Sequence, residues 1–165
     1  MTRPKNKKYS EFRQGIFKPR NPDKCVNKTQ IEYRSHLEFR VMIICDRNPT
    51  IIKWGSENVV IPYLHPVKSA KHNTPVVARY FMDFFVETVD GGKFLLEVKP
   101  EKQTAPPKKS KNKKLSTILY ENTTYSVNCA KWAAAKKYAK KHNMSFYILT
   151  EKDIDKLEKI SHTEL

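Results

Sequence analysis

The stretch that decides the fold is Arg79-Tyr80-Phe81-Met82-Asp83-Phe84-Phe85-Val86-Glu87, followed by Lys93-Phe94-Leu95-Leu96-Glu97-Val98-Lys99. Both runs are rich in aromatic and β-branched residues, which favour strands. The sequence Asp90-Gly91-Gly92 lies between them, and glycine in such a position is typical of a tight turn. We therefore predict two antiparallel strands joined as a β-hairpin.

Three charged residues interrupt these apolar runs: Asp83, Glu97 and Lys99. A charge inside a buried strand is costly unless it is paired or holds a metal ion. If Asp90-Gly91-Gly92 forms a three-residue loop with a glycine in the left-handed conformation, Asp83 lies opposite Lys99 and diagonal to Glu97, all on one face. A two-residue loop would turn Glu97 and Lys99 to the other face. We predict the three-residue loop, because it gathers the charges.

The length and charge of the chain limit the classes of protein to which it can belong. The 165 residues suit a single domain, and the formal net charge of +15 indicates a polyanionic partner, nucleic acid before a membrane surface. No apolar run approaches the ~18 residues of a membrane-spanning helix, so we expect a soluble, intracellular protein without a membrane partner. The sequence has no glycine-rich phosphate loop, and a nucleotide cofactor is not expected. Cys25, Cys45 and Cys129 are too far apart to suggest a disulfide framework or a zinc site.

The remaining segments predict an α/β (α+β) domain, a mixed sheet flanked by helices. Residues 1–30 form a basic arm, residues 31–160 the domain, and residues 161–165 a tail. Within the domain we expect helices over 33–46, 125–142 and 151–160, strands over 51–54, 59–63 and 146–150, and loops over 64–77 and 100–116. Pro62 cannot donate to a sheet ladder, so its strand should lie at an edge or end there.

Two basic segments are candidates for contact with DNA. The arm interleaves Lys and Arg with Tyr9, Phe12 and Phe17, and either packs on the domain or contacts DNA directly. The loop over 100–116 is too polar for a packed core. It is either a solvated charge run or a phosphate-binding surface, and the second reading is preferred. Its candidate phosphate-binding residues are Lys108, Lys109, Lys111, Lys113 and Lys114.

The charged residues of the hairpin are suited to metal-dependent chemistry. Asp83 and Glu97 offer the hard oxygen ligands that Mg²⁺ or Mn²⁺ prefers, and the backbone carbonyl of Val98 can complete the coordination. Lys99 would then lie against the nucleophilic water or the scissile phosphate. Glu38 could orient a metal-bound water. The alternatives are a buried ion cluster for the hairpin residues and simple helix capping for Glu38, since Ser35-His36-Leu37-Glu38 has the form of a capping box.

Asp83 followed by Glu97-Val98-Lys99, with Glu38 upstream, resembles the PD-(D/E)XK nuclease superfamily, although Met82 stands where proline usually precedes the aspartate. A wider set of segments looks like the head-completion nuclease family of T-even-type tailed phages, and a transposase endonuclease subunit has the same order of elements. These segments are Tyr33-Arg34-Ser35 running into Glu38, Trp54, residues 57–63, 80–85 and 96–100, and Asn128, Ala130, Lys131 and Trp132.

The resemblance implies a restriction-endonuclease-like fold and a Mg²⁺- or Mn²⁺-dependent DNA endonuclease. It implies catalytic roles for Glu38, Asp83, Glu97 and Lys99, and contacts of Arg34 and Lys131 with double-stranded DNA. It also implies action at or near the packaged DNA end, in the host cytoplasm during assembly and then in the head–neck region of the virion, beside portal and neck proteins. Two alternatives remain open: a non-catalytic DNA-binding plug on the same fold, and a junction-resolvase-like or transposase-type endonuclease.

Overall fold

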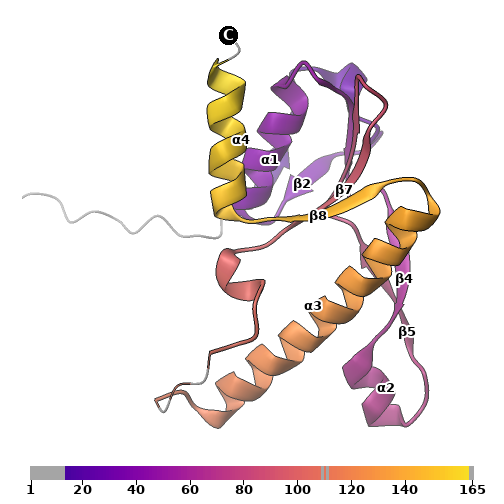
Figure 1. Cartoon of the computed structure of the whole chain (residues 1–165), viewed down its shortest axis with the longest axis vertical. Coiled ribbons are helices and arrows are strands. Elements are labelled where there is room, and N and C mark those ends of the chain that lie inside the picture. The colour runs from indigo at the N-terminus through magenta and orange to yellow at the C-terminus, as the bar shows by residue number, and fades with distance from the viewer. Residues whose placement is uncertain (1–13, 109, 111, 164–165) are drawn as a thin grey trace, which may run out of the picture.

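A computed structural model describes residues 14–108, 110 and 112–163 of the chain. Figure 1 shows a central β-sheet with helices on both sides. In chain order the elements are β1 (Gly15–Phe17), η1 (Pro22–Lys24), β2 (Ile31–Tyr33), α1 (His36–Arg47), β3 (Ile51–Ser56), β4 (Val60–Leu64), α2 (Pro66–His72), β5 (Val77–Phe81), β6 (Phe84–Thr88), β7 (Lys93–Val98), η2 (Glu101–Gln103), α3 (Leu115–Lys141), β8 (Ser145–Leu149) and α4 (Glu151–Thr163).

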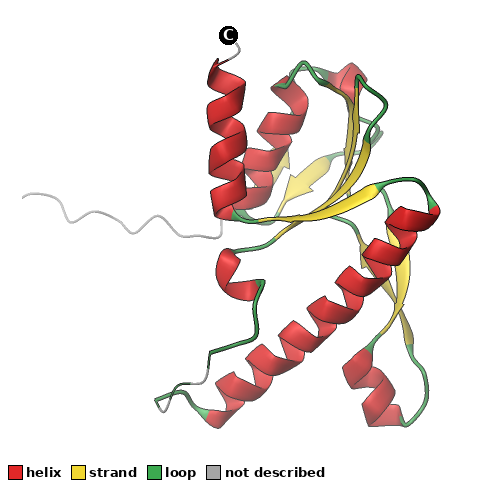
Figure 2. Ribbon diagram, viewed as in Figure 1, coloured by secondary structure: helices red, strands yellow, loops and turns green. Residues whose placement is uncertain are grey.

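The main sheet has the strand order β3-β6-β7-β8. It is mixed, because β8 runs parallel to β7 whereas the other neighbours are antiparallel. Helices α1 and α4 pack together on one side, and α3 crosses the other side against β7 and β8 (Figure 2). Strands β4 and β5 form a separate two-stranded sheet that also packs against α3. The predicted α+β, restriction-endonuclease-like class is confirmed.

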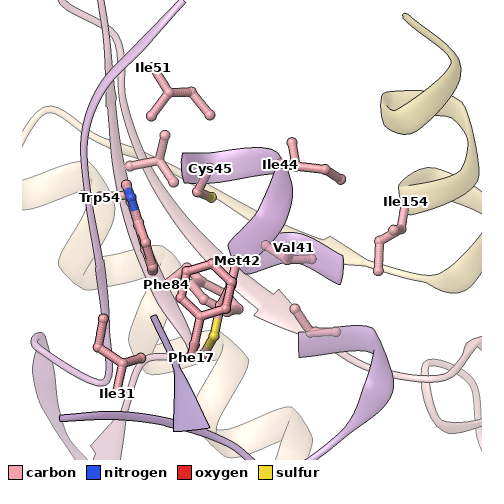
Figure 3. Close-up of a cluster of buried hydrophobic side chains, with 12 residues drawn as sticks. Phe17, Ile31, Val41, Met42, Ile44, Cys45, Ile51, Trp54, Phe84 and Ile154 are labelled. Atoms are coloured by element: carbon pink, nitrogen blue, oxygen red, sulfur yellow. The ribbon is translucent and has the colours of Figure 1, made fainter. Parts of the chain in front are cut away.

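Side chains along β7 point alternately to its two faces, and this divides the core into two parts. Phe94, Leu96 and Val98 face α1 and α4 and belong to the cluster around Trp54 and Phe84. Figure 3 shows the buried side chains of that cluster. Leu95, on the opposite face, packs with buried residues of β4, β5 and α3. Because side chains two residues apart share a face, Glu97 points with Leu95 to the α3 side. The charged residues of the hairpin therefore lie between the main sheet and the smaller one.

The hairpin keeps the predicted faces but has a different register. Glu87 pairs with Lys93, so the loop is centred one residue earlier than expected, and Gly91 takes the left-handed conformation with φ of 82°. Continuing this register places Asp83 opposite Glu97 and not opposite Lys99, as predicted. The residue opposite Asp83 thus moves by two positions along β7. This preserves the face because side chains in a strand alternate with a period of two.

The run over 79–87 is two strands and not one. β5 ends at Phe81 and pairs with β4, whereas β6 begins at Phe84 and belongs to the main sheet. Met82 and Asp83 connect the two sheets, and Met82 is fully buried. Pro62 lies within β4, which pairs with no strand other than β5 in the described part of the chain, so the prediction of an edge position is confirmed.

Two helices extend beyond the predicted segments. Part of the expected loop over 64–77 is α2, which has Pro66 in its first turn and is capped by the His65 side chain. Helix α3 begins at Leu115 and not near residue 125. Within its first ten residues, Leu115, Leu119 and Tyr120 are exposed. This part of the helix has no buried face that would impose a helical spacing on its apolar residues. The last helix continues to Thr163, into the segment expected as a tail.

The described part of the N-terminal arm packs on the domain. β1 pairs with β2, and Phe17 is buried against Trp54 and Phe39. The buried Asp46 carboxylate accepts hydrogen bonds from the backbone N–H groups of Arg20 and Asn21. Residues 1–13 lie outside the described part. None of the helices in the described residues is long and apolar enough to cross a membrane.

Candidate active site

The three charged residues of the hairpin converge on one pocket of about 590 Å³. Asp83 lies at the break between β5 and β6, Glu97 near the end of β7, and Lys99 just beyond that end. The pocket lies at the edge where the main sheet, the β4–β5 sheet and the N-terminus of α1 meet. Glu38 in the first turn of α1 also lines it, so the structure brings the four residues predicted as catalytic into one place.

Glu97 is almost completely buried, with 2% of its surface exposed, and each carboxylate oxygen has one partner. The Tyr80 hydroxyl donates a hydrogen bond to Oε2 at 2.5 Å. The Lys99 ammonium pairs with Oε1 at 2.8 Å. Both contacts are of the charge-assisted kind, which are shorter and stronger than neutral hydrogen bonds. Burial and the negative charge of Glu97 raise the pKa of the Tyr80 hydroxyl, which therefore stays protonated as a donor.

Asp83 is held by one backbone contact, since its Oδ2 accepts the N–H of Val98 at 2.8 Å. Burial, followed by the negative charge of Glu97, raises the pKa of Asp83 well above its usual value. The nearby Lys99 and the Val98 N–H act in the opposite direction but do not outweigh these two effects. The surroundings of Asp83 thus favour its protonated form more than water does, a preference that a bound cation would oppose.

Lys99 and Glu38 complete the group. Burial alone would lower the pKa of Lys99, but the negative charges of Glu97, Asp83 and Glu38 outweigh it, and the pKa is raised. The ammonium form is therefore favoured at neutral pH. Glu38 does serve the helix start, because its N–H donates to Ser35 Oγ at 3.1 Å and its carboxylate accepts from the Arg34 N–H at 2.8 Å. It is also close enough to act on Asp83 and Lys99 electrostatically.

The pocket is locally acidic in a strongly basic protein. The chain has 32 basic and 17 acidic residues. The pocket lining reverses that balance, with the acids Glu32, Glu38, Glu57, Asp83 and Glu97 against the bases Arg34, Arg79, Lys99 and Lys131. Acids gathered in one pocket of such a chain favour a cationic ligand there.

Asp83 and Glu97 are suited to hold a divalent metal ion, with help from other oxygens. Within the described residues, no three His, Cys, Asp or Glu side chains are grouped closely enough to hold a metal ion on their own. Mg²⁺ is usually bound by one or two carboxylates with waters and substrate phosphate oxygens, so a full protein cage is not required. Asp83 and Glu97, two neighbouring carboxylates in the pocket lining, fit that donor set.

The predicted DNA-binding residues fall into two groups. Arg34 and Lys131 line the pocket, where Arg34 pairs with Glu57 at 3.1 Å and the Lys131 ammonium lies over the rings of Tyr63 and Tyr80. The described candidate lysines of the loop, Lys108, Lys113 and Lys114, lie outside the pocket lining. Lys108 and Lys114 are exposed and Lys113 pairs with Glu121, whereas Lys109 and Lys111 lie outside the described residues.

Sequence reasoning missed Tyr80 and Glu57 as residues of the site. Tyr80 was counted only as an apolar strand residue, and its contact with Glu97 joins two different sheets, which no local spacing predicts. Glu57 has a left-handed backbone with φ of 51°, and its N–H donates to the Asp83 carbonyl at 3.2 Å. Such strained positions cluster at functional sites, but a sequence does not reveal them.

This combination of fold and site is that of a nuclease of the restriction-endonuclease-like class. Residues 48–151 match the family described as TnsA-like endonuclease N terminal, and the chain belongs to that family. The matched range includes Asp83, Glu97, Lys99 and Lys131, whereas Glu38 and Arg34 precede it. The predicted resemblance to the PD-(D/E)XK superfamily is confirmed at this level.

Comparison with individual proteins gives a relative whose name is more specific than that of the family. The chain is similar to the "Head completion nuclease" of Enterobacteria phage T4, with 40% identity over 125 residues. The similar region covers 74% of this chain and 79% of the relative. The similarity to head-completion nucleases expected from the sequence is thereby confirmed.

Proposed function

We propose that this protein is a divalent-metal-dependent DNA endonuclease that acts in the completion of phage heads. The observation that carries the proposal is the group formed by the buried Glu97 with the partly buried Asp83 and Lys99, which line one acid-rich pocket. A buried ion cluster is a poor source of stability, because the desolvation of the charges offsets their attraction. A cluster of this kind is better explained by chemistry than by folding.

Each residue has a role that its surroundings support. Asp83, Glu97 and the carbonyl of Val98 would hold Mg²⁺ or Mn²⁺, and Glu38 would reach the ion through a water molecule. When bound, the ion stabilises negative charge on the phosphodiester and lowers the pKa of a bound water. Lys99, whose raised pKa favours the ammonium form, donates hydrogen bonds toward the scissile phosphate or the attacking water. Arg34 and Lys131 at the pocket bind neighbouring phosphates of double-stranded DNA.

The biological setting is inferred from the relative. Its printed name is head completion nuclease, and the similarity extends over most of both chains. We infer that this protein hydrolyses phosphodiester bonds at or near the packaged DNA end. It would act in the host cytoplasm during assembly and then join the portal–neck region of the virion, where portal and neck proteins are its partners.

Cleavage of supercoiled and linear duplex DNA tests the enzymatic proposal. The purified protein is incubated with each DNA in Mg²⁺, in Mn²⁺ and in EDTA, at several salt concentrations. We expect nicking or linearisation with either ion and none in EDTA. No cleavage with either ion at any salt concentration would contradict the proposal. DNA binding alone decides nothing, since a chain of charge +15 binds DNA without regard to activity.

Complementation separates an enzyme from a non-catalytic plug on the same fold. A T4-type phage lacking its head completion nuclease is grown in cells that produce this protein or its Asp83→Ala variant. An enzyme predicts infectious particles with the natural protein only. Equal rescue by the variant, at equal protein level, would support the plug and contradict the enzymatic role.

A further inference from the structure

The contact between Tyr80 and Glu97 suggests how the site selects its metal ion. Tyr80 lies on β5 of the small sheet, whereas Glu97 lies on β7 of the main sheet. The hydrogen bond between them therefore is not a product of strand pairing. Both side chains are nearly inaccessible, with 3% of Tyr80 and 2% of Glu97 exposed, so water cannot easily replace the hydroxyl.

The two partners of Glu97 differ in what an arriving cation would do to them. Lys99 on Oε1 carries a positive charge, and a divalent ion binding at that oxygen would repel it. Tyr80 on Oε2 is neutral, and its O–H donates to an oxygen that stays negative when the ion binds. The ion is therefore expected to displace the lysine and leave the tyrosine in place. One oxygen of Glu97 becomes available and the other stays occupied.

We propose that Tyr80 is a positioning residue that restricts Glu97 to binding through a single oxygen, and that it thereby favours Mg²⁺ or Mn²⁺ over Ca²⁺. Mg²⁺ requires a near-octahedral arrangement at short distances, which single-oxygen carboxylates provide. Ca²⁺ takes more ligands and often binds both oxygens of a carboxylate. The inference rests on the proposed function, because it assumes that Glu97 is a ligand of the ion.

The Tyr80→Phe variant removes only the hydroxyl, and Tyr63→Phe is a matched control. Tyr63 packs edge-on against Tyr80 with ring centroids 6.4 Å apart, and Lys131 lies over both rings. Tyr63 as a residue is 7% exposed, but among the described residues its hydroxyl makes no hydrogen bond and is not one of the buried unpaired polar atoms, so this hydroxyl is in contact with solvent. A change seen in Tyr80→Phe and absent in Tyr63→Phe therefore reports on the Tyr80–Glu97 contact and not on the loss of any tyrosine hydroxyl beside Lys131.

The experiment measures dissociation constants for Mg²⁺, Mn²⁺ and Ca²⁺ by titration calorimetry on the full-length natural protein and on both variants. Removing a residue that hydrogen-bonds to a metal ligand typically weakens metal binding about 10- to 100-fold. We expect a weakening of that size for Mg²⁺ and Mn²⁺ in Tyr80→Phe. Ca²⁺ should lose little affinity or gain some, because both oxygens of Glu97 are then free. Tyr63→Phe should match the natural protein. Equal weakening of all three ions, or no change in their ratios, would overturn the inference.

A second measurement does not depend on the Tyr80→Phe variant. The infrared difference spectrum of the natural protein on addition of Mg²⁺ or Ca²⁺ reports how carboxylates bind, since single-oxygen binding separates the two carboxylate stretching bands more widely than two-oxygen binding. The Glu97→Gln spectrum identifies the Glu97 bands. We expect a wide separation with both ions, and a narrow one would contradict the inference. If the natural protein binds none of the ions and cuts no DNA, the proposed function itself fails; if it binds and cuts but the ion ratios do not move, only the role of Tyr80 fails.

Discussion

At the scale of single residues, Asp83 lowers the unfolding free energy of the metal-free protein as pH rises. Its pKa is raised above the unfolded value by burial and by Glu97. A carboxyl group of this kind favours the fold only below its unfolded pKa, so this contribution is lost as pH rises from about 4 through the folded pKa. Above the unfolded pKa the metal-free fold therefore lacks this contribution, and a bound cation would favour the carboxylate form of Asp83 in the fold.

The Asp83→Asn variant should accordingly be more stable than the natural protein in EDTA at pH 8. We expect a gain of at least about 1 kcal/mol, or roughly 2–4 °C in melting temperature, and the gain should vanish near pH 4. Saturating Mg²⁺ should raise the melting temperature of the natural protein and leave the variant unchanged. Thermal denaturation across pH with and without the ion measures all three effects. A variant that is less stable than the natural protein at pH 8 would show that Asp83 stabilises the fold.

The sequence predicted much of the site at this scale but missed Tyr80. Asp83, Glu97 and Lys99 share a face because strand periodicity is regular, so the prediction survived a register error of two positions. Tyr80 reaches Glu97 only because the chain leaves one sheet at Phe81 and enters another at Phe84. Apart from Asp83, the residues around that break are all apolar or aromatic, so no turn residue such as glycine or proline marks it.

At the scale of elements, one arginine joins α1 to α4. Arg40 contacts Glu158 through two hydrogen bonds, at 2.8 and 2.6 Å, and Asp155 at 2.5 Å. Its side chain is only 18% exposed, so these contacts are partly shielded from water. Two-point contacts between arginine and carboxylate are among the stronger polar interactions of proteins.

The Arg40→Met variant should lose about 1–2 kcal/mol of unfolding free energy, because it keeps the side-chain volume and removes the charge-assisted bonds. Lys152→Met is a matched control. Lys152 pairs with Glu101 at 2.7 Å with both side chains half or more exposed, so its loss should cost clearly less than the loss of Arg40. Urea denaturation measures both variants. Equal losses would show that the α1–α4 contact adds no more than an ordinary surface pair.

Elements were predictable where they bury a regular face. Helix α1, the hairpin and β8 all have such a face, and the sequence located them to within a few residues. Helix α2 has no buried residue, and the first ten residues of α3 bury no large apolar side chain, so periodicity could not reveal them. The signal for α2 lies at its start, where Pro66 follows the capping residue His65, and not in its composition.

At the scale of the whole molecule, the charge is divided between a basic surface and an acidic pocket. The fold class followed from the order of elements, but the gathering of five acids in one pocket required the three-dimensional structure. The surface should attract duplex DNA of any sequence, and the pocket should provide the cation for the reaction. Binding and cleavage are therefore expected to be separable by mutation.

Replacing Lys108 and Lys114 together by Gln tests the basic surface. If both exposed lysines contact phosphates, the slope of log K against log salt should decrease in magnitude by about 0.9 for each lysine. The control is Lys152→Gln, on a lysine already paired with Glu101. Fluorescence anisotropy with duplex DNA between low and moderate salt gives the slopes. An unchanged slope for the double variant would mean that the loop is only a solvated charge run.

The assignment of activity to the pocket is tested most directly by comparing variants in one cleavage assay. Cutting of supercoiled DNA in Mg²⁺ or Mn²⁺ is measured for the natural protein, Asp83→Ala, Glu97→Gln and the control Glu87→Gln, which alters the same hairpin away from the pocket. We expect cutting to be lost in the first two variants while DNA binding persists, and the control to cut normally. Equal cutting by all four proteins would contradict the assignment, because the activity would then come from another site or another protein.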